Sequence, residues 1–525
     1  MANGFAVCDN RLSMRRRGLA AGGWASLAAV TLVVAWAIPA QGGNWNQNAH
    51  YALVRALADG RPNIDQSLRE TGDNTGDISF FRGHRYAAKA PGLAFWTLPA
   101  FLALRIAGDA KPSGDLFRIL WFLGLWATVL PATILFLLVR KIADDIAPGF
   151  GTITAMTLGV ATLVLPFTTM FFAHVLTATL GFGAFALLWL EGHRHPRIRI
   201  AAAAGLLAGL AITVELPSAI LVAGLAFYLL TREPRLPRIL AYSGGVGLGL
   251  LPLLLFNQWA FGSITHLSYA GVAGGYWNRQ GLYGVAAPSF HVATELLFST
   301  RGLVRATPVL ALGAVGILLL YRRGRRAEAL LIAGVSLAYL LFNSGYDNPF
   351  GGDTPGPRYL IPIIPFLILP LGLVYQRFPL MTIVLGAVSA LQMVVVTMTS
   401  PILAVYGDWF GRLWARKLVY TAFGFGPGSN HAMPLFALLL LLAAIFAILA
   451  TPRARLSRPD LARAALALLS WLLIAEAAPK LIRNGGGELV LVYAAVAAAT
   501  LIITFLPRAL FRSTQLDDSL RQPAT

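Results

Sequence analysis

Long apolar segments recur along the whole chain, and they constrain the fold more than any other feature. A helix needs about 20 apolar residues to cross the hydrocarbon core of a bilayer. Segments of this kind cover residues 19–40, 115–139, 148–172, 175–191, 237–258, 302–320, 327–343, 359–376, 380–400, 433–450 and 488–507. Two shorter segments, 199–213 and 216–231, meet at the break Glu215-Leu216-Pro217, and a weaker one covers 464–479. The sequence therefore predicts an all-α polytopic membrane protein with about 12–14 transmembrane helices.

The composition excludes a soluble enzyme of this length. Hydrophobic residues make up 57% of the 525 residues and charged residues 12%, whereas soluble domains carry roughly 25% charged residues. Lys and Arg outnumber Asp and Glu by 42 to 23, but they lie in short clusters between the apolar segments. Such clusters are typical of topology signals, so we expect the bilayer and no nucleic acid as a partner. The single cysteine, Cys8, excludes an intrachain disulfide.

The basic clusters predict which loops face the cytoplasm. Four arginines, Arg11 and Arg15-Arg16-Arg17, precede the first apolar segment, which indicates a retained signal anchor and a cytoplasmic N-terminus. The later clusters agree with this orientation if one crossing lies between residues 41–90 and Arg140. Four long or polar loops then face outward: 41–90, 259–301, 344–358 and 401–432. We expect a multi-pass protein of a bacterial inner membrane, with its active site on the extracytoplasmic face.

This topology divides the chain into four parts. They are a cytoplasmic N-terminus at 1–18, a catalytic membrane module at 19–376, further transmembrane helices at 377–507 and a cytoplasmic tail at 508–525. The segment from Pro91 to Ile106 competes with 115–139 for the one crossing before Arg140. Because 91–106 is short and carries Pro99 at its middle, we assign it to an interfacial or re-entrant helix. The alternative is that 91–106 spans and the Arg140-Lys141 cluster violates the rule.

The first outer loop combines many carboxylates with a basic end. Its charged residues include Asp59, Asp65, Glu70, Asp73, Asp77, His84, Arg85 and Lys89. Pro91 then opens an apolar helix, and a helix N-terminus with a nearby lysine is a site for phosphate. Lys89 would lie at the depth of the lipid headgroups. The alternative is a lysine that snorkels at a helix end.

Other polar residues fall on the outer side in the same scheme. His174 lies at a turn between two spans and Glu215 at the break between two short helices, and ionisable residues at membrane depth indicate function. Arg358 beside Tyr359 can bind phosphate with two hydrogen bonds. The neighbouring carboxylates, Asp347 and Asp353, would orient it or bind a sugar. Alternatively, His174 is a hydrogen-bonded interfacial residue and Arg358 an interface anchor.

Two motifs resemble the polyprenyl-phosphate-dependent type C glycosyltransferases, which include protein O-mannosyltransferases and lipid A aminoarabinose transferases. The first is Gly83-His84-Arg85-Tyr86 followed by Lys89-Ala90-Pro91-Gly92-Leu93, which looks like the end of their first outer loop. The second is Gly356-Pro357-Arg358-Tyr359-Leu360, which resembles a step in bacterial members. The resemblance implies a type C bundle that transfers a sugar from a polyprenyl-phosphate donor to an extracytoplasmic acceptor, commonly with inversion.

The implied reaction needs a carboxylate near the acceptor hydroxyl and cations on the departing phosphate. Many members carry an Asp-Glu pair after the first span, where this chain has Asn46-Gln47-Asn48-Ala49-His50-Tyr51. We therefore expect Asp77 to be the general base, with Asp73 as second choice. The expected phosphate ligands are Lys89, Arg85, Arg358 and Arg301. The expected substrate-binding residues are His84, Tyr86, His174, Glu215, Asp347, Asp353 and Tyr359.

Other classes of function lack their signatures. The sequence has no P-loop, no HExxH and no cluster of Cys and His with metal-ligand spacing, so we expect no metal or other cofactor. Dependence on a divalent ion stays open. The main alternative is a secondary transporter or a flippase of lipid-linked sugars, which would place ionisable residues near the bilayer midplane and show two related halves. A non-catalytic assembly subunit would have no convergent polar cluster.

A cysteine at Lys111 distinguishes the two topologies of the segment 91–106. We expect labelling by an impermeant thiol reagent from the outer side, because a re-entrant helix leaves both of its ends outside. Labelling only from the cytoplasmic side would show that the segment spans, and it would move His174 and Glu215 away from the outer face.

Overall fold

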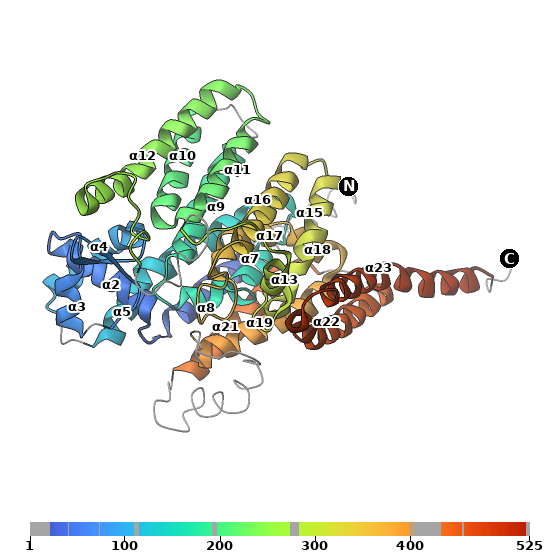
Figure 1. The fold of residues 1–525 in the computed structure, drawn as a ribbon. Coiled ribbons are helices and arrows are strands. Elements are labelled where there is room, and N and C mark those ends of the chain that lie inside the picture. The colour runs from blue at the N-terminus through green and yellow to red at the C-terminus, as the bar shows by residue number, and fades with distance from the viewer. Residues whose placement is uncertain are drawn as a thin grey trace, which may run out of the picture.

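The computed structural model describes residues 21–39, 41–72, 74–109, 115–191, 197–272, 283–399, 402, 432–453 and 456–520. These residues form helices with one short pair of antiparallel strands, as Figure 1 shows. The elements of the first outer loop are α2 (Trp45–Ala58), α3 (Asp65–Thr71), β1 (Ile78–Phe81), β2 (His84–Ala87) and α4 (Gly92–Ile106). A helix at Ala21–Ala37 precedes them.

The remaining elements are helical. They are α5 (Leu116–Gly124), α6 (Leu130–Ile146), α7 (Gly151–Val160), α8 (Val164–Thr168), α9 (His174–Glu191), α10 (Ile198–Val214), α11 (Ala219–Leu229), α12 (Arg235–Phe261), α13 (Phe290–Phe298), α14 (Leu303–Ala306), α15 (Leu312–Arg322), α16 (Arg326–Ser344), the 3-10 helix η4 (Arg358–Ile363), α17 (Ile364–Ile368), α18 (Leu371–Arg377), α19 (Pro379–Thr399), α21 (Met433–Ala450), α22 (Arg458–Asn484) and α23 (Glu488–Leu520). A π-helical turn, Leu125–Val129, joins α5 to α6.

The prediction of an all-α polytopic membrane fold is confirmed, with the strand pair as an addition. Eight helices of the described residues are long and apolar enough to cross a membrane, or ten if each of two bent helix pairs is one span. Five shorter apolar helices have 10–17 residues. The predicted count of about 12–14 crossings therefore depends on some of these shorter helices.

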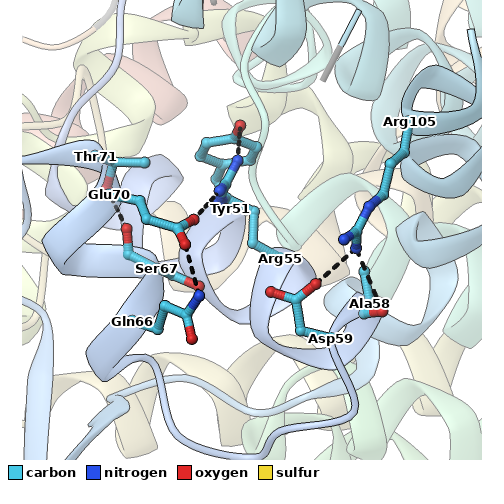
Figure 2. A network of polar contacts seen from close by, with 9 residues as sticks. All are labelled: Tyr51, Arg55, Ala58, Asp59, Gln66, Ser67, Glu70, Thr71 and Arg105. Atoms are coloured by element: carbon cyan, nitrogen blue, oxygen red, sulfur yellow. Dashed lines mark hydrogen bonds and ion pairs between the residues drawn. The ribbon is translucent and has the colours of Figure 1, made fainter. Parts of the chain in front are cut away.

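The helix α4 keeps both of its ends against the first outer loop. Its N-terminal end follows β2, and α2 packs along it. At its other end, Arg105 Nη1 donates to Asp59 Oδ1 over 2.7 Å and to the Ala58 carbonyl over 3.4 Å, both at the end of α2 (Figure 2). The assignment of this segment to an interfacial or re-entrant helix stays a prediction. The labelling position Lys111 lies outside the described residues.

Charged side chains of the first outer loop bind one another and connect its helices. Arg55 of α2 binds the carboxylate of Glu70 and the hydroxyl of Tyr51, and Gln66 donates to the same carboxylate over 2.7 Å (Figure 2). Because Arg55 is buried, these hydrogen bonds satisfy a guanidinium that would otherwise be costly to desolvate. The network holds α3 against α2.

A tight hairpin places Asp77 beside Lys89. Arg82 and Gly83 connect β1 to β2, with φ angles of 47° and 81°, in the region that favours glycine. The strands pair Ile78 with Ala87. One step further, the Ala88 N–H donates to the Asp77 carbonyl over 2.9 Å. The turn therefore places Asp77 opposite Ala88 and beside Lys89.

The helices α10 and α12 approach closely through glycines and rise side by side in Figure 1. Gly205 and Gly209 of α10 face Gly245 and Gly249 of α12, and a Cβ on any of them would overlap the backbone of the other helix. Small residues at such spacing are typical of close helix pairs in membranes. The pair holds Glu215, which follows α10, in a fixed place.

We expect Gly245→Leu to lower thermal stability in detergent, because its side chain would meet the Ala202 carbonyl oxygen. Overpacking of this kind costs about 1–3 kcal/mol. The matched control is Gly247→Leu on the same helix, where an added Cβ has nothing within 4 Å. Equal melting temperatures for the two variants would show that the close approach of α10 and α12 is not needed for stability.

Candidate functional site

A polar cavity of about 50 Å³ lies where the first outer loop meets later parts of the chain. Six of the residues predicted from sequence line it: Asp77, Lys89, His174, Glu215, Arg358 and Tyr359. Its other lining residues are Asn46, His50, Ala88, Ala90, Ala173, Val214, Tyr269, Val272 and Tyr346. Residues far apart in sequence thus converge on one space.

Asp77 and Lys89 form an ion pair inside this cavity. Lys89 Nζ lies 2.6 Å from Asp77 Oδ2, and the two side chains are 11% and 10% exposed. The Asp77 N–H donates to Thr75 Oγ1 over 3.1 Å, and Thr75 Oγ1 donates to the Trp45 carbonyl over 2.6 Å. The hairpin on one side and α2 on the other therefore hold the carboxylate in place.

The start of α4 is fixed against α10 and the loop after α12. Ser268 Oγ donates to the Lys89 carbonyl over 2.8 Å, and the Ala90 N–H donates to the Tyr269 hydroxyl over 3.3 Å. A Cβ on Gly92 would overlap the Thr213 backbone, so glycine permits this approach. As a result, Lys89 shares the cavity with Glu215, two residues beyond Thr213.

His174 and Glu215 form a second pair. His174 Nδ1 lies 2.5 Å from Glu215 Oε1, and both side chains are largely buried. His174 begins α9, and Glu215 has extended backbone geometry where α10 ends. The ring of Tyr359 meets the imidazole edge-on at a centroid distance of 5.7 Å. Both ring nitrogens of His174 are buried, and neither has a hydrogen-bond partner of regular geometry among the described residues.

Arg358 is a buried cation at the start of η4. Its guanidinium lies over the rings of Phe172 and Tyr359, 5.5 and 5.2 Å from their centroids, and Nη2 donates to the Tyr359 hydroxyl over 3.3 Å. Nε has no hydrogen-bond partner. Gly351 has a φ of 77°, and a Cβ there would overlap the guanidinium. Arg358 is therefore positioned to bind an anion in the cavity.

An apolar space of about 420 Å³ adjoins the polar cavity. The two share Glu215, Tyr269, Tyr346 and Tyr359. The rest of the apolar space is lined by Leu216, Pro217, Ala219, Ile220, Leu267, Tyr283, Val285 and Phe342. The site thus joins a charged compartment to an apolar one.

Sequence reasoning missed the contribution of α2. Asn46 and His50, four residues apart, lie on one helix face and line the cavity. Burial, followed by the charges of Lys89, His174 and Arg358, holds the pKa of His50 well below its usual value. Its imidazole is therefore neutral near pH 7. The available signal was the segment 46–51, which stands where the resembling family carries acidic residues.

Several predicted site residues are bound elsewhere. Asp65 Oδ2 lies 2.8 Å from His84 Nδ1, and its Oδ1 lies 3.2 Å from Arg85 Nε. Burial raises the pKa of Asp65, but the hydrogen bonds from His84 and Arg85 outweigh it and lower that pKa. The Tyr86 hydroxyl donates to the Ala260 carbonyl over 3.0 Å. His84, Arg85 and Tyr86 lie on the hairpin but do not line the cavity.

The remaining predicted residues also lie outside the cavity lining. Arg301 Nη1 donates to the carbonyls of Gly352 and Thr354, over 2.9 and 3.2 Å, so it braces the loop before Arg358. Asp347 and Asp353 line neither space. Asp73 lies outside the described residues. Within the part of the chain that the structure describes, no three His, Cys, Asp or Glu side chains are grouped to hold a metal ion.

No protein-family model and no curated protein matches this chain. Solved structures that match include ArnT from Cupriavidus metallidurans, with 16% identity, a TM-score of 0.44, and coverage of 92% of this chain and 76% of that one. The Archaeoglobus fulgidus oligosaccharyltransferase matches with 12% identity and a TM-score of 0.43, over 86% of this chain and 58% of that one. Arabinosyltransferase EmbB from Mycobacterium smegmatis matches with 13% identity and a TM-score of 0.40, over 91% of this chain and 41% of that one.

We expect Lys89→Met to lower the free energy of unfolding by about 3–5 kcal/mol, because it leaves the buried Asp77 carboxylate without its partner. The double variant Asp77→Asn with Lys89→Met should recover most of this loss, as a double-mutant cycle in detergent would measure. Lys141→Met is the matched control, since Lys141 pairs with Asp145 at an exposed position. Additive losses in the double variant would mean that the pair does not stabilise the loop.

Proposed function

We propose that this chain is an integral-membrane glycosyltransferase that moves a sugar from a polyprenyl-phosphate donor to an acceptor on the extracytoplasmic face. One observation carries the proposal: a cavity with Lys89 and Arg358 lies next to an apolar space, and the two share the lining residues Glu215, Tyr269, Tyr346 and Tyr359. A ligand that fits both compartments has an anionic head and an apolar tail. A polyprenyl phosphate is such a ligand.

The cavity supplies the groups that the transfer needs. In the reaction, the bond between the sugar C1 and a phosphate oxygen breaks, and its electron pair stays on the phosphate. Lys89 and Arg358 would bind the phosphate as its negative charge grows. Meanwhile, the acceptor oxygen bonds to C1 and gives its proton to a base. The carboxylate of Asp77 is our candidate for that base.

The ion pair gives the two substrates an order. In the structure, Lys89 Nζ lies 2.6 Å from the Asp77 carboxylate. A donor phosphate competes for the same ammonium, so its arrival weakens the hold of Lys89 on Asp77. The carboxylate is then available to the acceptor hydroxyl. The acceptor hydroxyl therefore meets a free base only when a donor is present.

We expect Asp77→Asn to reduce turnover by about 10²–10⁴-fold while donor binding persists, because an amide keeps the shape but cannot accept the proton. The measurement is sugar transfer by purified protein across a panel of undecaprenyl-phosphate sugars, with binding of undecaprenyl phosphate measured separately. Asp145→Asn is the control, since this aspartate also pairs with a lysine but is exposed.

Three outcomes separate the alternatives. Unchanged turnover in Asp77→Asn would move the base to Asp73 or Glu215. A wild-type protein that carries a lipid-linked sugar across vesicle membranes without forming product would favour the transporter. A wild-type protein that neither binds undecaprenyl phosphate nor transfers sugar would contradict the proposal.

A further inference from the structure

The imidazole of His174 lines the cavity and lies beside a carboxylate. Nδ1 lies 2.5 Å from Glu215 Oε1, and among the described residues neither Nδ1 nor Nε2 has a hydrogen-bond partner of regular geometry. The side chain is 4% exposed. A buried polar atom without a partner costs about 1–3 kcal/mol. His174 lines a cavity that also contains the cations Lys89 and Arg358, so a ligand in that cavity can complete the bonding of the imidazole.

The apolar space places that ligand. It meets the polar cavity at Glu215, Tyr269, Tyr346 and Tyr359. His174 is bound to the first of these residues and contacts the ring of the last. A lipid chain in the apolar space would therefore bring its headgroup into the cavity on the side of His174. Asn46, His50 and Asp77 also line the cavity, where they are available to the sugar and the acceptor.

The hydrogen-bonding pattern of His174 makes the binding of an anion depend on a proton. Because the Glu215 carboxylate lies 2.5 Å from Nδ1, it favours the tautomer with the proton on Nδ1, and a neutral imidazole then has its lone pair at Nε2. A lone pair repels a phosphate oxygen, whereas a protonated ring donates from Nε2–H. Lys89 and Arg358 line the same cavity as the carboxylates of Asp77 and Glu215, so the positive and negative charges there already balance, and an added anion favours a further positive charge on His174.

We propose that His174 is a third phosphate ligand that takes up a proton when the lipid phosphate binds, with Glu215 as its counter-ion. This inference rests on the proposed function and extends it to an unassigned residue pair. The charged and titratable groups around His174 are Glu215, Lys89, Arg358, Asp77, His50 and the hydroxyls of Tyr359, Tyr269 and Tyr346. Of the side chains in this set, the carboxylate of Glu215 is the one at hydrogen-bond distance from the imidazole.

The bound proton also has a use in the reaction. When the C1–O bond breaks, the phosphate gains one negative charge. His174 Nε2–H donates a hydrogen bond to that oxygen and can transfer its proton to it, which leaves a neutral imidazole and a singly charged phosphate. Asp77 gains the proton of the acceptor hydroxyl. Charge and protons balance, and no other reactant is needed.

The test counts protons during binding. Calorimetry of undecaprenyl phosphate binding in detergent, in buffers with different ionisation enthalpies at about pH 7.5, gives the number of protons taken up. We expect the wild-type protein to take up roughly one proton more than His174→Gln, because glutamine can donate but does not titrate. The subtraction removes the proton contribution of the ligand itself. Wild-type affinity should also fall by up to about tenfold per pH unit, with a flatter dependence in the variant.

Two further variants keep the result interpretable. Glu215→Gln removes the counter-ion and should reduce proton uptake while leaving the imidazole in place. His291→Gln is the matched control, because His291 faces Glu295 at 3.5 Å, is 42% exposed and lies outside the cavity. It should behave as the wild type. If His174→Gln unfolds in a thermal scan, His174→Asn and Glu215→Gln carry the comparison.

The outcomes also separate this inference from the proposed function. Equal proton uptake in the wild type and His174→Gln would overturn the role of His174, whatever the lipid affinity. A second arm uses inorganic phosphate. Binding of inorganic phosphate with proton uptake through His174, without binding of undecaprenyl phosphate, would support His174 as a phosphate ligand and would contradict the lipid donor. If neither ligand binds, both proposals fall.

Discussion

The ion pair between Asp77 and Lys89 is the interaction on which the site depends. It joins the two sides of a loop that lies between membrane helices, and it holds a carboxylate and an ammonium 2.6 Å apart in a largely buried place. Buried charges are costly unless they are paired. The pair exists because the Arg82-Gly83 turn sets the hairpin register, and the Thr75 hydroxyl holds the Asp77 backbone against α2.

The charges of the cavity nearly balance without a ligand. The two carboxylates, Asp77 and Glu215, are matched by the two cations, Lys89 and Arg358. Asp77 is ion-paired with Lys89, Glu215 lies beside the imidazole of His174, and Arg358 contacts aromatic rings and one hydroxyl. A guanidinium over aromatic faces keeps its capacity to bind an anion, because rings do not neutralise it. An anionic headgroup would therefore meet Arg358 first. It would then also bind Lys89 and His174, which already lie in the cavity but contact carboxylates.

Close backbone approaches place these side chains. Gly92 lets α4 begin against Thr213, which brings Lys89 beside Glu215, and Gly351 leaves room for the guanidinium of Arg358. The glycines shared by α10 and α12 hold the end of α10 in place. In a bilayer, apolar side chains gain little by leaving lipid, so van der Waals packing at small residues supplies much of the helix association. The geometry of the site therefore depends on small residues that take no part in its chemistry.

The sequence by itself determined the membrane fold, the loop that carries the charges and the individual candidates Asp77, Lys89, His174, Glu215 and Arg358, because hydropathy and charge patterns are local properties of a chain. It did not indicate the hairpin, the participation of His50 or the separate partners of Arg85 and Arg301. Those features depend on strand register and helix packing, which join residues far apart in sequence. Which charges share one cavity, and which are bound elsewhere, was decided only by the tertiary structure, because the energy of a charge depends on its nearest neighbours in space.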